Sequence, residues 1–290
     1  MSEPIQHVSD TAYLVATHRA IESERPDALF RDPLAERLSG AHGRAIVKRM
    51  GAAGAMIGWS AVVRTVVIDQ YIRTAIAEGG DTILNLGAGL DTRPYRLALP
   101  EAVRWIEVDY PHVIEHKNAV LRDERPTCRL ERRAVDLADA AARRALFAEV
   151  DANARKVLVL TEGVIPYLRD EDVASLADDL RACETFRYWV ADYFAPEAYK
   201  YRERSSMRKR MQHAPFRFQP ADYFGFFTQH GWRARDTRYM GLEGRTLGRP
   251  MPLPRVFRWW LALMGSRVTP EQRERALKFT GYVLFEPAAG

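Results

Sequence analysis

The stretch that most constrains the fold is an apolar strand that runs into two glycines and a proline. Residues 82–94 read TILNLGAGLDTRP. A strand, a glycine turn and a helix opened by Pro94 are typical of the first unit of a nucleotide-binding sheet. Gly87 and Gly89 let the main chain bend sharply and approach a ligand closely. We therefore expect a bound group at the carboxyl edge of a parallel sheet.

A second apolar strand follows, and it ends in an acid. Residues 103–109 read VRWIEVD, so Asp109 lies about twenty residues beyond the glycines, where a ribose-binding acid is expected. A carboxylate can accept hydrogen bonds from both ribose hydroxyls. The alternative is that Asp109 caps the helix after Pro111, because aspartate is also a common N-cap. A dinucleotide fingerprint would need a third glycine where Thr92 stands, which argues against NAD.

The order and spacing of these motifs resemble the leucine carboxyl methyltransferase-like family, which includes bacterial O-methyltransferases acting on polyketides. The matching residues are Arg64 with Thr65 and Asp69, residues 85–93, residues 107–111, Asp136 with Leu137, and residues 161–165. The resemblance implies the class I, Rossmann-like methyltransferase sheet, with S-adenosyl-L-methionine as the cofactor. That cofactor has no phosphate, so a loop without the third glycine suits it better than it suits NAD.

The resemblance also implies the residues that hold this cofactor. They are Arg19, Arg64, Gly87, Ala88, Gly89, Asp109, Tyr110, Asp136, Leu137 and Glu162. Arg64 would bind the methionine carboxylate, and its almost entirely apolar neighbours favour a partner anion over a solvated helix face. Glu162 follows the strand at 156–160 and would face the ammonium group, or else serve as an acid at a helix N-terminus. Arg19 would add a second positive charge, or be a surface cation.

The need for a catalytic base depends on the acceptor. A carboxylic acid is already ionised at neutral pH, whereas a phenol benefits from a base. His18, His213 and Tyr193 are the candidates, with Asp192 beside Tyr193 as a comparable one. A lone histidine is more often a surface or core residue than a base, so both histidines can equally be bystanders.

The 290 residues fit a single α/β domain without a linker or repeat. We expect an N-terminal helical segment over 1–80, a cofactor-binding core over 81–193, and acceptor-side helices and strands over 194–290. The sheet is predicted to be mostly parallel, with strands at 232–239 and 279–285 forming an antiparallel C-terminal hairpin at one edge. The N-terminal segment and the helical insertions would form a cap.

Composition limits the partners. The net charge is +5 and part of the excess falls within 200–210, but charge runs are usually solvated helix faces, so we expect no nucleic acid. No apolar run reaches the ~20 residues that cross a bilayer, and the first residues lack a signal peptide pattern, which predicts a cytoplasmic protein without a membrane partner. Cys128 and Cys183 suggest neither a disulfide nor a metal site. A homo-oligomer is compatible with the sequence.

Together these observations favour an S-adenosylmethionine-dependent O-methyltransferase acting on a carboxyl or phenolic oxygen of a small acceptor. Many aromatic residues follow position 215, and some could line a pocket for a flat, polyketide-like molecule, although core packing would absorb most of them. The same segment includes residues 256–264, which could form an acceptor wall. The alternatives are a noncatalytic S-adenosylmethionine-binding protein, an RNA-modifying methyltransferase and an NAD-dependent oxidoreductase.

Overall fold

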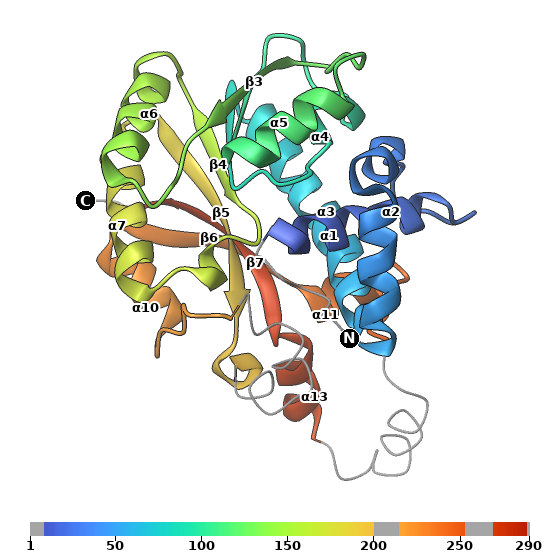
Figure 1. Ribbon diagram of the computed structural model, residues 1–290. Helices are drawn as coiled ribbons and strands as arrows, with labels where there is room; N and C mark the ends of the chain where they lie inside the picture. Colours follow the sequence, from blue (N-terminus) through green and yellow to red (C-terminus); the bar gives the residue numbers. More distant parts are fainter. Residues whose placement is uncertain (1–8, 200–214, 253–268, 289–290) are drawn as a thin grey trace.

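The computed structural model describes residues 9–199, 215–252 and 269–288, and these form a seven-stranded sheet with helices on both faces (Figure 1). The strand order is β3-β2-β1-β4-β5-β7-β6. The strands are β1 (Thr82–Leu86), β2 (Arg104–Asp109), β3 (Arg129–Ala134), β4 (Val157–Thr161), β5 (Phe186–Phe194), β6 (Trp232–Tyr239) and β7 (Thr280–Pro287). Strands β1 to β5 pair in parallel, and β7 pairs antiparallel with both β5 and β6.

The α/β class and the mostly parallel sheet are therefore confirmed. The two C-terminal strands are antiparallel neighbours at one edge of the sheet, as expected, and helices lie between them along the chain. Strand β7 lies inside the sheet and β6 forms its edge.

Helices precede and alternate with the strands. They are α1 (Ser9–Ser23), α2 (Pro33–Met50), α3 (Ala52–Ala77), α4 (Arg93–Arg96), α5 (Pro111–Val120), α6 (Ala140–Ala152), the 3₁₀ helix η1 (Ile165–Tyr167), α7 (Asp170–Arg181), α10 (Tyr223–Gln229), α11 (Met240–Thr246) and α13 (Pro270–Leu277). None of the helices in the described ranges is long and apolar enough to span a membrane.

The sheet separates two hydrophobic cores. On one face, side chains of α6, α7 and α10 pack on the strands around Phe147, Leu176 and Phe227. On the other face, α3 and α11 pack on the strands through residues such as Ile68 and Met240. Strands β1 and β4 are buried over their whole length, because a parallel strand in the centre of such a sheet is covered on both sides.

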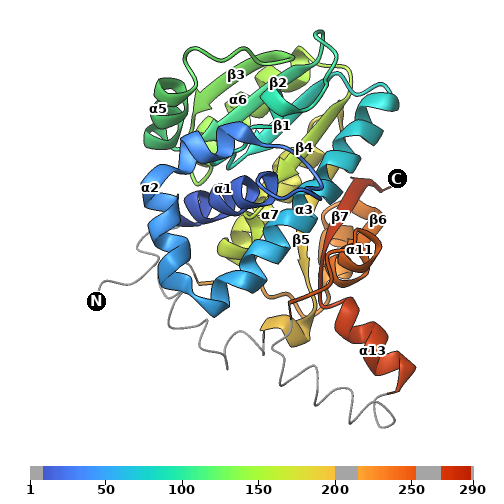
Figure 2. The same ribbon diagram turned by 90° about the vertical axis from the view of Figure 1, so that its right-hand side faces the viewer.

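Helices α1 and α2 lie beside α3 (Figure 2) and form hydrophobic clusters separate from the two sheet cores. Helix α1 packs against α2 and α3, and its Arg19 donates a hydrogen bond to the Leu90 carbonyl in the loop after β1. The predicted N-terminal helical segment is thus a set of helices docked onto the carboxyl edge of the sheet, where the sequence places the cofactor.

Candidate functional site

The glycine loop after β1 has the backbone conformation that the sequence predicts. Gly87 and Gly89 have φ angles of 67° and 49°, a region that only glycine adopts readily. The amides of Gly87 and Ala88 both donate to the Val108 carbonyl of β2, at 2.8 and 3.0 Å. A Cβ atom on Gly87 would lie 2.5 Å from Val164 Cγ2, so this turn also needs glycine for space.

Asp109 ends β2 beside this loop. The Gly89 amide donates to Asp109 Oδ2 at 2.6 Å, and the Tyr110 amide donates to Oδ1 at 2.7 Å. Because an ionised carboxylate has about four lone-pair positions, these two hydrogen bonds do not saturate Asp109, and its contact with a ribose stays a prediction. The alternative role as a helix cap does not apply, since Tyr110 is the N-cap residue of α5.

Arg64 and Glu162 face one another across the carboxyl edge of β4. Arg64 Nε lies 2.8 Å from Glu162 Oε1, and both side chains are mostly buried. The apolar surroundings of Arg64 predicted an anionic partner, and the partner in the protein itself is this carboxylate. Among the described residues, Arg64 Nε makes no well-aligned hydrogen bond despite this proximity.

Arg93 holds Glu162 from the other side, and sequence reasoning missed it. Its guanidinium donates to Asp69 at 2.7 Å, to Asp91 at 2.7 Å and to Glu162 at 2.8 Å. These carboxylates come from α3, the glycine loop and the end of β4. Asp69 also accepts two hydrogen bonds from Arg96. The nearby positive charges of Arg93 and Arg64 lower the pKa of Glu162 and keep it ionised despite its burial.

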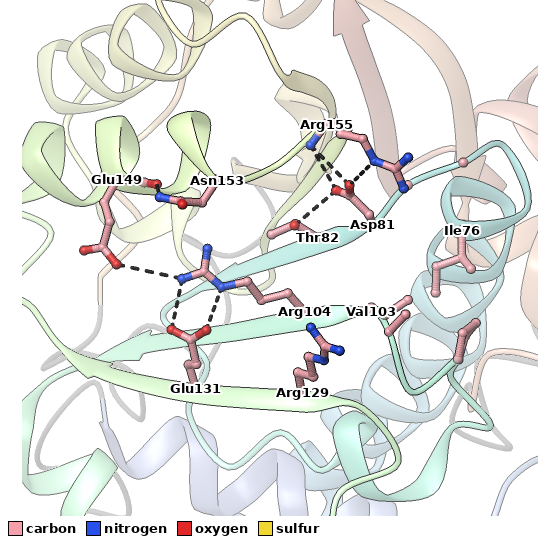
Figure 3. A pocket seen from close by; sticks show the side chains of 14 residues that line it. Ile76, Asp81, Thr82, Val103, Arg104, Arg129, Glu131, Glu149, Asn153 and Arg155 are labelled. Carbon is pink, nitrogen blue, oxygen red and sulfur yellow. Dashed lines mark hydrogen bonds and ion pairs between the residues drawn. The ribbon is translucent and has the colours of Figure 1, made fainter.

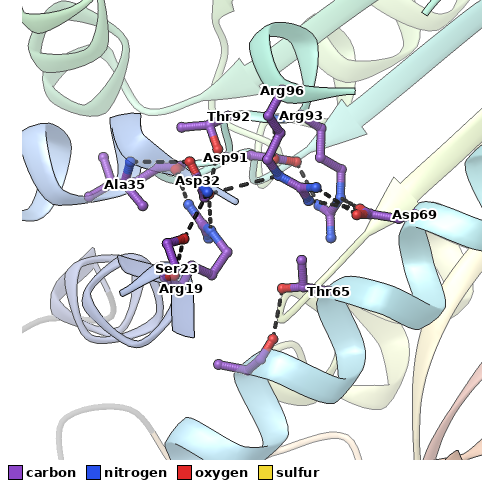
Figure 4. Close-up of polar contacts among 12 residues, drawn as sticks. Arg19, Ser23, Asp32, Ala35, Thr65, Asp69, Asp91, Thr92, Arg93 and Arg96 are labelled. Carbon is purple, nitrogen blue, oxygen red and sulfur yellow. Dashed lines mark hydrogen bonds and ion pairs between the residues drawn. The ribbon is translucent and has the colours of Figure 1, made fainter. Parts of the chain in front are cut away.

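Arg19 belongs to a second group of polar contacts, next to those of Arg93 (Figure 4). Its guanidinium is buried and donates to Asp32 at 2.8 Å and to the Leu90 carbonyl at 2.5 Å. Thr92 donates to the same Asp32 oxygen at 2.6 Å. Arg19 is therefore neither a surface cation nor directed at an open position in the described structure, and its contact with a cofactor stays a prediction.

The residues predicted to contact adenine lie after β3, on the other side of β2. Asp136 is exposed and accepts a hydrogen bond from the Ala138 amide, while Leu137 is half-buried against the core. Tyr110 is 48% exposed, and its ring stacks on His112 with centroids 6.0 Å apart. The ring thus lies on the surface beside Asp109, and its contact with a cofactor stays a prediction.

The three candidate bases have different surroundings. His18 on α1 is buried against Gly58 of α3, and burial lowers its pKa to about 4, so it is neutral and weakly basic at pH 7. Tyr193 near the end of β5 is half-buried, and burial raises its pKa. His213 lies outside the described residues. A catalytic role stays a prediction for each of them.

Asp192, the fourth candidate, is a buried carboxyl group near the carboxyl end of β5. It accepts a hydrogen bond from Tyr282 Oη at 2.7 Å and one from the Gly163 amide at 2.9 Å. Burial outweighs these bonds and the nearby Arg64 charge, and it raises the pKa of Asp192 to about 6. Asp192 thus joins β5 and β7 to the turn that carries Glu162.

The aromatic residues after position 215 divide between the core and this edge. Phe218, Phe227 and Trp232 are buried in the core against α7, as the packing alternative predicted. By contrast, Phe216 is half-buried and its ring meets those of Tyr167 and Phe194, with centroids 5.3 and 4.9 Å apart. The segment 256–264, predicted as an acceptor wall, lies outside the described residues.

A separate hollow of about 720 Å³ lies at the opposite, amino edge of the strands (Figure 3). Its charged lining pairs internally: Arg104 with Glu131 at 2.6 Å, and Arg155 with Asp81 at 2.9 Å. The ligands of open α/β sheets bind at the carboxyl ends of the strands, so this hollow is not the predicted cofactor site.

Comparisons with known proteins identify the family of this chain. The family model for leucine carboxyl methyltransferase matches residues 12–181. A Streptomyces avermitilis protein that carries a provisional name as an S-adenosyl-L-methionine-dependent methyltransferase is 31% identical over 267 residues, covering 84% of this chain and 89% of the relative. A Streptomyces coelicolor protein with the same kind of name is 43% identical over 133 residues, which span 42% of this chain and 46% of that protein.

Solved structures share the fold at low identity. A provisionally assigned methyltransferase from Thermobifida fusca superposes with a TM-score of 0.56 at 15% identity, covering 88% of this chain and 93% of the other. A protein of the DUF574 family from Streptomyces avermitilis gives 0.52 at 16% identity, covering 94% and 96%. Because the family model spans more than half of the residues and the Streptomyces avermitilis relative, at 31% identity, covers 84% of them, this chain belongs to the leucine carboxyl methyltransferase family.

Proposed function

We propose that this chain is an S-adenosylmethionine-dependent O-methyltransferase, and that its acceptor is a small, flat aromatic or polyketide-like molecule with a phenolic or carboxyl oxygen. The observation that carries the cofactor assignment is the Arg64–Glu162 pair beside the glycine loop. The methionyl end of the cofactor is a zwitterion. A guanidinium and a carboxylate 2.8 Å apart offer the complementary charges for its carboxylate and ammonium groups.

The other candidate residues fit the same molecule. Asp109 has lone pairs available toward ribose hydroxyls, and Tyr110 offers an exposed ring next to it. Gly87 and Gly89 remove side chains from the loop that would pass beneath the methionyl part. Asp136 and Leu137 would contact the adenine from the end of β3. When bound, S-adenosylmethionine would supply an electrophilic methyl group to an acceptor oxygen.

The chain's own contribution to transfer would be positioning and the exclusion of water. Glu162 and Arg64 would orient the amino acid end of the cofactor, and the helices α1 to α3 would cover it. The rings of Tyr167, Phe194 and Phe216 support a flat apolar acceptor, because Tyr167 follows Glu162 closely in η1 and so borders the cofactor side.

Calorimetric titration tests the cofactor assignment. We expect S-adenosylmethionine to bind with micromolar affinity and NAD not to bind. Replacing Arg64 with alanine should weaken binding of S-adenosylmethionine about 10- to 150-fold, as for a lost charge-assisted bond. Arg155→Ala, at the opposite edge of the sheet, is the matched control and should bind like wild type. NAD binding, or equal affinity in the Arg64 variant, would refute the assignment.

A pair of acceptors with the same aromatic ring separates the two reactions. One acceptor carries a phenol and the other a carboxylic acid, and methyl transfer is followed by mass spectrometry across pH 6 to 9. Phenol methylation that rises with pH indicates transfer to a hydroxyl oxygen that must first lose its proton, whereas pH-independent ester formation indicates a carboxyl acceptor. Tight cofactor binding without transfer to any aromatic acceptor would contradict the proposed acceptor class.

A further inference from the structure

Asp32, at the start of α2, joins three segments of the chain through one buried carboxylate. The side chain is completely buried. Its Oδ2 atom accepts hydrogen bonds from Arg19 Nε of α1 at 2.8 Å and from Thr92 Oγ1 of the glycine loop at 2.6 Å. Its Oδ1 atom accepts from the Ala35 amide at 3.2 Å, which caps α2. Figure 4 shows these donors converging on Asp32.

The loop is held at two points by this arrangement. Thr92 is bound through its own hydroxyl, and Leu90 is bound through its carbonyl by the second nitrogen of Arg19. Thr92 and Asp32 have no exposed surface, so neither can touch a ligand at this edge. Any influence of these two residues on a ligand must pass through the conformation of the loop.

The loop needs such support because of its sequence. Gly87 and Gly89 have many accessible backbone conformations, so the loop loses much entropy when it is fixed in one of them. A protein that adopts its binding conformation only part of the time has an apparent dissociation constant raised by the reciprocal of that fraction. Contacts that fix the loop before binding therefore raise affinity without touching the ligand.

We propose that Asp32 is a positioning residue. Through Arg19 and Thr92 it holds the glycine loop after β1 in its binding conformation in the free protein. This inference rests on the proposed function for the identity of the ligand. It gives Arg19 a different role from the predicted contact with the methionine carboxylate: Arg19 holds Leu90 in place. The N-terminal helices thereby become part of the cofactor site, because the cap of α2 and the loop after β1 share one carboxylate.

Thr92→Val is the most direct test, since valine keeps the shape of threonine and Asp32 retains its bonds to Arg19 and Ala35. Thr92→Ser restores a hydroxyl at that position. Thr65→Val is the matched control, because Thr65 is equally buried but donates only to the Ala61 carbonyl of its own helix. The measurements are calorimetric affinity for S-adenosylmethionine and hydrogen exchange of the peptide covering residues 87–93 in the ligand-free protein.

We expect Thr92→Val to exchange faster over residues 87–93 and to bind S-adenosylmethionine about tenfold more weakly, as for a loop that is competent about a tenth of the time. Thr92→Ser should recover most of both effects, and Thr65→Val should match wild type. Unchanged exchange over residues 87–93 in Thr92→Val overturns the inference, whether or not the wild type binds. Faster exchange with unchanged affinity also overturns it. Wild type that fails to bind S-adenosylmethionine refutes the proposed function separately.

Discussion

Arg93 Nη1 donates a hydrogen bond to Glu162 Oε2 at 2.8 Å, which ties the first turn after the glycine loop to the end of β4. The same guanidinium binds Asp69 of α3, so one buried cation joins helix, loop and strand. Glu162 in turn faces Arg64, the residue predicted to bind the carboxylate of the cofactor. The position of the candidate binding pair therefore depends on a residue that would not itself touch the cofactor.

Replacing Arg93 with methionine should destabilise the protein strongly. In this variant Asp69 still pairs with Arg96, and Glu162 still pairs with Arg64. Asp69, Asp91 and Glu162 nevertheless all lose the cation that they share. Removing one partner of a buried ion pair costs about 3 to 5 kcal/mol, and we expect a loss in this range in urea unfolding at pH 7.5. Arg155→Met, at a side chain that is 87% exposed, should change stability by less than about 0.5 kcal/mol. Equal stability of the two variants would contradict the structural role of Arg93.

Lys117 and Glu107 should behave as an interdependent pair. Both side chains are fully buried, with Lys117 Nζ 2.8 Å from Glu107 Oε1, and Arg132 binds the other carboxylate oxygen. Lys117→Met leaves Glu107 with one cation and should cost about 3 to 5 kcal/mol. Adding Glu107→Gln removes the buried charge and should recover part of that loss. A double-mutant cycle in urea measures the coupling, and additive losses would show that the pair is independent.

The sequence predicted the fold and the strands and loops that carry the candidate site residues, because these follow from local patterns. Strand β1, the glycine loop and Asp109 at the end of β2 are each visible in short stretches of sequence. Arg64 was predicted to have an anionic partner because of its apolar neighbours, and Glu162 is that partner. The cofactor roles of these residues come from the family resemblance and stay predictions.

The buried charge network could not be predicted from sequence, because its members lie far apart along the chain. Arg19 and Leu90 are 71 residues apart, and nothing local pairs them.

Strand β3 could not be predicted either. Its sequence, RLERRA, is rich in charged residues and gives no apolar signal, because it is an edge strand whose half-exposed side chains pair with one another. The core location of Phe227 and Trp232 is likewise decided by how α10 and β6 pack, not by their own sequence.

Asp192 should make the free energy of unfolding fall as the pH rises from about 4 to 6. Burial raises its pKa to about 6 in the folded protein, above the unfolded value near 3.9, so the folded state binds the proton more tightly. This contribution is fully present below about pH 4 and is lost as the pH rises through 6, by about 3 kcal/mol in total. Asp192→Asn has no proton to lose there, and its amide can still accept from the Gly163 amide and donate to Tyr282.

The measurement is the stability difference between Asp192→Asn and wild type from pH 4 to 7.5, by urea unfolding. We expect the difference to move in favour of the variant as the pH rises. Asp123→Asn, at an exposed carboxylate, is the control and should show no such trend. A constant difference for Asp192→Asn would mean that Asp192 titrates at its ordinary pKa.

Gly87 and Gly163 offer a comparison of backbone strain with and without a clash, since their φ angles are 67° and 69°. An alanine in this region costs about 1 to 2 kcal/mol at either position. At Gly163 the new Cβ would meet only Arg64 Nη1, at 3.8 Å, whereas at Gly87 it would lie 2.5 Å from Val164 Cγ2. Because the strain is the same, Gly87→Ala should cost about 1 to 3 kcal/mol more, measured by urea unfolding. Adding Val164→Ala should relieve that excess in Gly87→Ala, and equal costs for the two glycines would show instead that Val164 moves aside freely.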